Sequence, residues 1–312
     1  MFQLYKKRDF SALVGDTFGF FKLEGKNYFK NYFIINGSLL LLLVVIIYFF
    51  TNIFIQGALS NIQTQNEQNF YDEMYSNIGL FIGLGVLMLL LILIISMLNY
   101  SFPVAYLKLM EQNKERNFEN LIHYFKSKIG RIVIFFLLSI VVLFPILFIV
   151  MILTFLSVFI IIGIPLVILL IPTIMSFTSL FYITYITEEV GYFEAFGKAY
   201  NMLKKNYFPI IGATFVMYMI IQVTLGILTM IPYIIGVLFL FTNPEAIENE
   251  KNNGFSTIAM ILVAIVIISI VFNYTLQNLM LINQGITYYS CKEELENISV
   301  NNSIDLIGTD EA

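Results

Sequence analysis

The chain has 312 residues, of which 59% are hydrophobic and 12% are charged, and its formal net charge is −4. The charged share is about half that of a soluble domain, so this composition argues against a water-exposed fold and favours a protein whose solvent is lipid. One cysteine, Cys291, excludes an intramolecular disulfide, and one histidine, His123, excludes a metal centre with several histidine ligands.

Five stretches without Asp, Glu, Lys or Arg predict the membrane spans, and these stretches are residues 31–66, 74–107, 132–187, 206–244 and 252–291. A span takes roughly 20 residues, so four stretches hold one helix each and the longest holds two. The turn between those two is expected at Ile162-Gly163-Ile164-Pro165, where Gly and Pro interrupt the run. The predicted spans are 33–55, 78–104, 132–156, 165–187, 208–231 and 257–282.

Basic residues are distributed unequally between the two sides of these spans. Loops 56–77 and 242–256 contain one basic residue, Lys251, and six acidic ones, whereas the opposite side carries the other 16 Lys and Arg. The side richer in Lys and Arg faces the cytoplasm, so both termini are expected there. The predicted fold class is therefore all-α, a polytopic integral membrane protein with six transmembrane helices.

The segments that precede alternate spans share a helical stripe with the spacing i, i+3, i+4, i+7 and i+11. The three stripes are Phe10-Leu13-Val14-Thr17-Phe21, Phe118-Leu121-Ile122-Phe125-Ile129 and Phe193-Phe196-Gly197-Tyr200-Lys204. Such stripes predict amphipathic interfacial helices. With the similar span ends AYLKLMEQ, TYITEEV and TYYSCKEEL, they predict three repeats of one interfacial helix and a two-span hairpin. The repeats are residues 10–107, 118–187 and 193–290 of a single domain, 1–295, and the acidic tail 296–312 is expected to be disordered.

Some residues within or next to the spans have expected structural roles. Gly79 and Gly83 form a G-x-x-x-G pair that permits close helix approach. The prolines are expected to kink or end helices, at Pro103, Pro145, Pro172 and Pro232. Residues 232–241 exceed what the fifth span needs, and two placements are open: an outward extension of that helix, or the outer membrane interface.

Catalytic chemistry is not indicated by any motif. The sequence has no Ser-His-Asp arrangement, Gly-rich phosphate loop or His-x-x-Glu-His motif, so no catalytic, cofactor-binding or metal-binding residue is predicted. His123 is interpreted as a solvated loop histidine, and Glu188-Glu189 as solvated charges at a span end. No nucleic-acid partner is expected, because the basic residues are dispersed among acidic ones.

Neutral polar residues inside the spans form the candidate site. Asn273, Gln277 and Gln284 share one face of the last span, and five residues lie at similar depth in the other hairpins: Asn99, Ser101, Ser176, Thr178 and Ser179. Two interpretations are open. The bands line a cavity for a polar head group, or they form interhelical hydrogen bonds worth about 1 kcal/mol or less each. The spans contain no charged residue, which argues against a proton- or sodium-coupled carrier.

A resemblance to a known family lies in the run YITEEVGYFEAFGKAYNMLKKNYFPIIGATF, residues 185–215. Its acidic turn, Phe/Ala helix and Lys-Lys-Asn entry to a span resemble a bacterial superfamily of multi-pass proteins related to the membrane domain of glycerophosphoryl diester phosphodiesterases. The resemblance covers most of the chain as a pattern and implies six spans in a bacterial inner membrane. In some relatives a catalytic barrel is attached to that domain, and no counterpart of this barrel is expected in these 312 residues.

These observations predict a non-enzymatic inner-membrane protein that acts as an accessory or scaffold component by binding lipid or another membrane protein. The expected partners are the bilayer, a membrane protein or a second copy of the chain, without a cofactor. Basic residues near the inner surface attract anionic lipid by roughly 1 kcal/mol each. The alternative is an uncoupled carrier or flippase-like transporter of a lipid or other amphiphile, and a third hypothesis is a membrane subunit that serves a separate phosphodiesterase.

Overall fold

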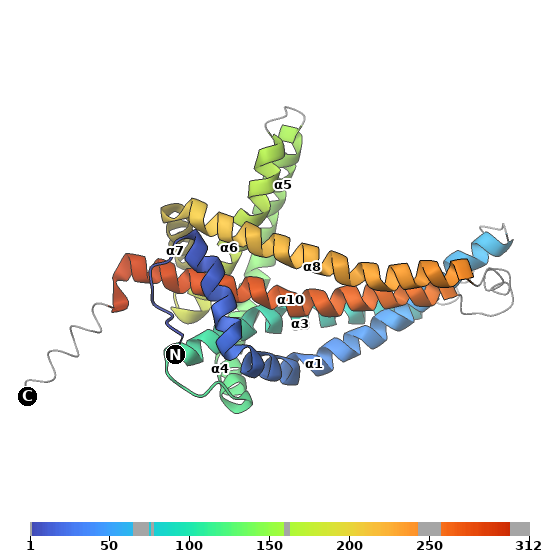
Figure 1. Cartoon of the computed structure of the whole chain (residues 1–312), viewed down its shortest axis with the longest axis horizontal. Helices are drawn as coiled ribbons and strands as arrows, with labels where there is room; N and C mark the ends of the chain where they lie inside the picture. The colour runs from blue at the N-terminus through green and yellow to red at the C-terminus, as the bar shows by residue number, and fades with distance from the viewer. Residues whose placement is uncertain (1, 65–74, 76–77, 159–162, 243–256, 300–312) are drawn as a thin grey trace, which may run out of the picture. The chain divides into compact units, whose positions relative to one another are not determined.

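The computed structural model describes residues 2–64, 75, 78–158, 163–242 and 257–299, and these residues contain no strand (Figure 1). The predicted all-α class is confirmed. The helices are α1 (Phe10–Thr64), α3 (Ile78–Glu111), α4 (Phe118–Leu138), the π-helical segment η1 (Ser139–Leu143), α5 (Phe144–Val158), α6 (Gly163–Thr187), α7 (Tyr192–Lys205), α8 (Tyr207–Thr242) and α10 (Thr257–Glu296). The tail 300–312 and most of the two acidic loops lie outside the described residues.

Six of these helical segments are long and apolar enough to cross a membrane, which confirms the six predicted spans. The segments are Phe10–Thr51, Ile78–Glu111, Phe118–Ser157, Pro165–Thr187, Tyr207–Phe239 and Val263–Glu296. The longest charge-free stretch does hold two helices, α5 ending at Val158 and α6 beginning at Gly163. Of the predicted turn, Gly163, Ile164 and Pro165 lie in α6, and Ile162 lies outside the described residues. Pro165 lies in the first turn of α6, where the missing N–H has no helical partner to lose.

The prolines do not end helices. Pro103, Pro172 and Pro232 lie inside α3, α6 and α8. Pro145 follows η1 by two residues. Its ring would clash with the carbonyl of Val141 in a regular α-helix, and the wider π-helical turn gives that carbonyl room. Residues 232–241 continue α8 to Thr242, which fits the first of the two placements left open by the sequence.

Contacts between residues divide the chain into two compact units. Unit 1 comprises Met1–Ile35, Asn99–Ile220 and Gln277–Ala312, and unit 2 comprises Asn36–Leu98 and Ile221–Leu276. Helices α1, α3, α8 and α10 contribute to both units, whereas α4 to α7 belong to unit 1 alone. The sequence predicts one domain, 1–295, and shows no boundary of this kind because each unit is assembled from separate segments.

Unit 2 is an apolar helical unit, whose described residues contain no Asp, Glu, Lys or Arg. Its helices pack through the stacked rings of Phe50 and Phe81, with centroids 4.7 Å apart. A Cβ added at Gly236 would meet Ile261, so this glycine allows a close helix approach. The predicted G-x-x-x-G contact is wrong for the described residues, because a Cβ at Gly79 or Gly83 would meet nothing within 4 Å.

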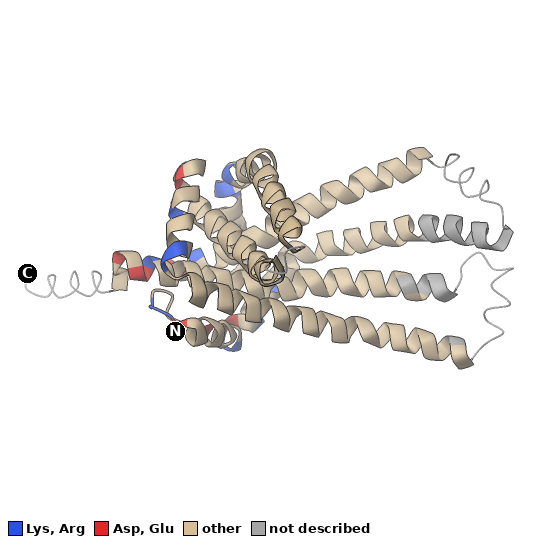
Figure 2. Cartoon of the chain, turned by 90° about the horizontal axis from the view of Figure 1, so that it is seen from above, with Lys and Arg blue, Asp and Glu red and all other residues tan. Residues whose placement is uncertain are grey.

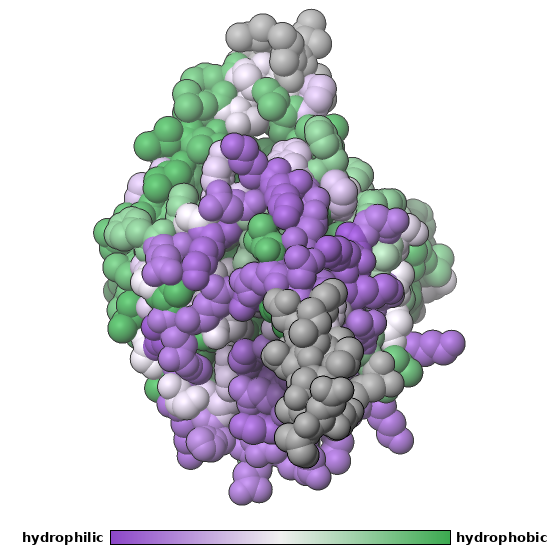
Figure 3. Space-filling view, turned by 90° about the vertical axis from the view of Figure 1, so that its left-hand side faces the viewer, coloured by the Kyte–Doolittle hydropathy of each residue, from purple (hydrophilic) through white to green (hydrophobic). Residues whose placement is uncertain are grey.

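Unit 1 carries all the charged residues that the structure describes, and Figure 2 shows them toward one end of this unit. Viewed from that end, hydrophilic residues gather on the face and apolar residues form its flanks (Figure 3). A polar end with apolar flanks is what a helical unit requires when its sides contact lipid and one end contacts water.

The three segments expected to be interfacial helices have buried residues at matching positions, although their C-terminal ends differ. Asp9, Asn117 and Gly191 precede the first helical residues, and the side chains of Asp9 and Asn117 cap their helices. The fourth and eighth residues after each of these positions are buried: Leu13 and Thr17, Leu121 and Phe125, and Ala195 and Ala199.

The third predicted stripe is wrong by one position, because the buried residues of α7 precede the predicted ones by one residue. Ala195 and Ala199 are buried in place of Phe196 and Tyr200. Only α7 is a separate helix, broken from α8 at Asn206, whereas the first and second segments continue into the following spans. Figure 1 shows that α1 changes direction after its first turns.

The centre of unit 1 is the meeting of α3, α6 and α10. They leave a residual cavity of about 10 Å³ lined by Val104, Leu107, Ile183, Thr187, Leu281, Gly285 and Tyr289. A Cβ added at Gly285 would collide with Cδ1 of Leu107, so the absent side chain lets α3 and α10 approach. These three helices are the second members of the three predicted hairpins.

We expect Gly285→Ala to destabilise the protein by about 1–3 kcal/mol, the usual cost of overpacking, although Ala is the better helix former. The control is Gly130→Ala, where an added Cβ meets nothing within 4 Å. Thermal unfolding in mild detergent measures both variants. Equal or higher midpoints for Gly285→Ala than for Gly130→Ala would contradict the close approach of α3 and α10.

Candidate functional site

Part of the predicted polar site forms a buried hydrogen-bond network between α1, α3 and α10. The Tyr32 hydroxyl donates to Oδ1 of Asn99 at 2.9 Å, and Nδ2 of Asn99 donates to Oε1 of Gln277 at 3.1 Å. Beside them, the Tyr28 hydroxyl donates to Oδ1 of Asn278 at 2.6 Å. The network also includes Tyr28, Tyr32 and Asn278. Of all its residues, the sequence pattern identified only Asn99 and Gln277 as site residues.

A second polar group joins α6, α8 and α10. The hydroxyl oxygens of Ser176 and Thr214 lie 2.7 Å apart, and Nε2 of Gln284 donates to Oγ1 of Thr214 at 2.7 Å. Thr214, which the sequence analysis did not select, thus connects two predicted residues. On the α3 side, Ser101 is hydrogen-bonded to the hydroxyl of Tyr182 in α6.

The remaining predicted residues do not join these groups in the same way. Ser179 is buried, and Oγ1 of Thr178 has no hydrogen-bond partner among the described residues. Asn273 belongs to unit 2, and its side chain is exposed. Most of the polar band in unit 1 is therefore engaged in bonds between helices, as expected for helix packing in lipid.

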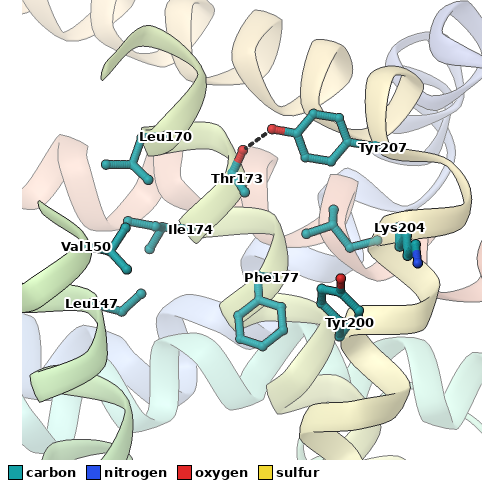
Figure 4. Close-up of a pocket in the computed structure, with 10 residues that line it drawn as sticks. Leu147, Val150, Leu170, Thr173, Ile174, Phe177, Tyr200, Lys204 and Tyr207 are labelled. Atoms are coloured by element: carbon teal, nitrogen blue, oxygen red, sulfur yellow. Dashed lines mark hydrogen bonds between the residues drawn. The ribbon is translucent and has the colours of Figure 1, made fainter. Parts of the chain in front are cut away.

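A different part of unit 1 contains an apolar pocket of about 410 Å³ between α5, α6, α7 and α8 (Figure 4). Most of its wall consists of apolar side chains of α5 (Leu147 and Val150) and of α6 (Leu170, Ile174 and Phe177). Phe177 is held by an edge-to-face contact with Phe196 of α7, with ring centroids 4.9 Å apart. None of the eight predicted site residues lines this pocket.

One end of the pocket is polar. Tyr200 and Lys204 lie one turn apart on α7, and Tyr207 begins α8. The hydroxyls of Tyr207 and Thr173 are 2.9 Å apart, which fixes the start of α8 against α6. In Figure 4, Tyr200 and Lys204 lie on one side of the pocket, opposite the aliphatic side chains of α5 and Leu170. The pocket thus has an apolar wall and one end where Tyr200, Tyr207 and the exposed Lys204 lie, and we call it the bipolar pocket.

The local sequence of α7 explains why the pocket forms. Ala195 and Ala199 are buried, and such small side chains let a short helix approach its neighbours closely. The break at Asn206, with φ −126° and ψ 44°, then redirects the chain into α8. The sequence signal was present in the third stripe, where Lys204 is the one charged member of an otherwise apolar or aromatic set.

A charged cluster connects the end of α6 with the middle of α7 and with the last turns of α10. Glu188 accepts hydrogen bonds from the Tyr288 hydroxyl at 2.9 Å and from Nζ of Lys198 at 3.0 Å, and Nζ of Lys292 lies 3.4 Å away. Burial alone would raise the pKa of Glu188, but Lys198, Lys292 and Tyr288 outweigh burial and hold the pKa below its usual value. The expectation of a solvated charge is wrong for Glu188, whose side chain is 11% exposed, and fits Glu189, which is 63% exposed and paired with Lys128.

The polar and charged groups described above give little support to metal binding or to nucleophilic catalysis. Among the residues that the structure describes, no cluster of three His, Cys, Asp or Glu side chains is arranged to hold a metal ion. His123 is exposed and Cys291 is buried. The bipolar pocket is therefore the feature whose chemistry points most directly to a ligand.

The chain matches no family model, no curated protein and no solved structure. The functional interpretation consequently depends on the geometry and chemistry of the pocket itself.

We expect the Glu188 cluster to lose its stabilising effect in acid. Because the folded pKa is lowered, the contribution is present above the unfolded pKa, near 4.5, and is lost as pH falls through the folded value. In Glu188→Gln, the thermal unfolding midpoint should therefore fall less steeply than in wild type between about pH 6 and pH 3. At neutral pH, this variant should lose about 1–3 kcal/mol of unfolding free energy.

Glu189→Gln is the matched control, because an exposed ion pair contributes only about 0–1 kcal/mol. Thermal unfolding in detergent at a series of pH values compares the two variants. A wild-type-like pH profile for Glu188→Gln would contradict the role given to this cluster.

Proposed function

We propose that the chain is a multi-pass protein of a bacterial inner membrane that binds lipid non-catalytically, as an accessory or scaffold component. The observation that carries this proposal is the bipolar pocket between α5, α6, α7 and α8. Its volume of about 410 Å³ is within the range of small-molecule sites, roughly 300–1,000 Å³. Its wall is aliphatic and aromatic, which suits an acyl chain.

The surroundings of the pocket support lipid as the ligand class. Helix α5 presents large apolar side chains outward, including Phe144, Phe148, Leu153 and Phe155, each more than half exposed. In a membrane these side chains contact acyl chains, so a lipid can reach the pocket from the bilayer without crossing water.

The proposed orientation places both termini, and with them the charged end of unit 1, in the cytoplasm. It rests on the excess of Lys and Arg on that side of the spans. Lys204 and the start of α8 then lie near the inner membrane surface, at the level where lipid head groups meet water.

The threefold repeat belongs to the same proposal. Two observations support it: the buried fourth and eighth residues at the starts of α1, α4 and α7, and the meeting of α3, α6 and α10 around Gly285. The proposed relation to the membrane domain of glycerophosphoryl diester phosphodiesterases rests on run 185–215, which contains Tyr200, Lys204 and Tyr207.

A binding function explains the polar residues of the spans better than a transport function does. A carrier of the alternative kind needs polar groups available to a moving substrate, yet Asn99, Ser101 and Ser176 are hydrogen-bonded to side chains of neighbouring helices. Their bonds favour a fixed bundle with a lipid held at its side.

We expect Val150→Trp to fill the pocket and reduce the lipid that copurifies in mild detergent by about tenfold, equal to roughly 1.4 kcal/mol. Quantitative mass spectrometry of extracted lipid per mole of protein measures this change. The control is Leu153→Trp, on the same helix but outside the pocket and 61% exposed. Equal lipid retention by the two variants would contradict lipid binding in this pocket.

A further inference from the structure

We infer that the pocket selects an anionic phospholipid, with an acyl chain along the α5–α6 wall and the phosphate bound by Lys204. This inference rests on the lipid-binding function proposed above and adds the head-group class. It also identifies Lys204 as the residue that determines specificity.

The charge of Lys204 differs from those of the other lysines of α7 in its surroundings. Lys198 is paired with Glu188 and Glu194, at 3.0 and 3.2 Å, and Nζ of Lys205 donates to the backbone carbonyl of Glu294 at 3.3 Å. Lys204 forms no ion pair with any of the residues that the structure describes. Of the three lysines on α7, the one that lines the pocket is thus the one whose ammonium group has no acceptor among the residues that the structure describes.

The hydrogen-bond donors near this ammonium group suit a phosphate. Tyr200 lies one helical turn before Lys204, so both project from the same side of α7. An ammonium group donates up to three hydrogen bonds, and a phenolic hydroxyl donates one more. A phosphate diester offers several acceptor oxygens and a negative charge, which suit this pair, whereas the choline of a zwitterionic lipid would place a second cation near Lys204.

The apolar wall of the pocket leads to this cation. Figure 4 shows Thr173, Ile174 and Phe177 of α6 between the aliphatic side chains and the α7 residues. One amphiphile can therefore contact the apolar wall and the ammonium group together. Charge complementarity favours an anionic head group, and the bilayer supplies phospholipid as the abundant amphiphile, so we commit to this ligand over a free fatty acid.

The test is a competition on the full chain in mild detergent with equimolar phosphatidylglycerol and phosphatidylcholine, followed by native mass spectrometry. Wild type should retain phosphatidylglycerol over phosphatidylcholine by about tenfold, or roughly 1.4 kcal/mol. Lys204→Gln should bring this ratio close to one while total bound lipid persists. Lys204→Arg should keep the preference, which shows that charge is required and that the site is folded. Lys205→Gln is the matched control and should resemble wild type.

The outcomes separate this inference from the proposed function. Lipid bound without a head-group preference, or a preference unchanged in Lys204→Gln, overturns the inference and leaves lipid binding in place. A mass that corresponds to added oleate, when oleate competes with phosphatidylglycerol, also overturns it. Loss of lipid from wild type, or no effect of Val150→Trp, refutes the proposed function itself.

Discussion

Lipid offers no hydrogen bonds, so a polar side chain inside a membrane helix must find its partner within the protein, either in its own helix or on another one. Unit 1 follows this constraint closely. Tyr32, Asn99 and Gln277 connect α1, α3 and α10, and Ser176, Thr214 and Gln284 connect α6, α8 and α10. Helix α10 takes part in both groups. These bonds hold the helices that meet at Gly285, so the polar residues of the spans serve mainly to fix the bundle.

The fixed bundle also determines where charge is placed. Glu188 contacts Tyr288, Lys198 and Lys292 and so joins the end of α6 to the middle of α7 and to the last turns of α10. This cluster holds α7 against the bundle, and α7 in turn presents Tyr200 and Lys204 to the pocket. The polar end of the proposed lipid site is therefore formed largely by α7. This helix is held by the ion pairs of Lys198 and carries Lys204, which forms no ion pair with the described residues.

The sequence predicts the features that depend on composition along the chain. Charge-free stretches identify all six spans, because a charged residue is costly in lipid wherever the neighbouring helices lie. Contacts between helices are harder to predict. Gly79 and Gly83 match a packing motif and make no close contact, whereas Gly285 matches none and lies against Leu107. The pocket combines residues from four helices with no shared spacing. In the sequence, only Lys204, the charged member of the third stripe, indicated this pocket.

The most direct test of this account is a cryo-EM structure of the protein in nanodiscs that contain phosphatidylglycerol. The account predicts continuous density for one acyl chain along Leu147, Val150 and Ile174, joined to head-group density next to Lys204. A pocket closed by the side chains of α5 and α6, or lipid density only on the outer surface of α5, would contradict the claim that this protein holds a specific lipid.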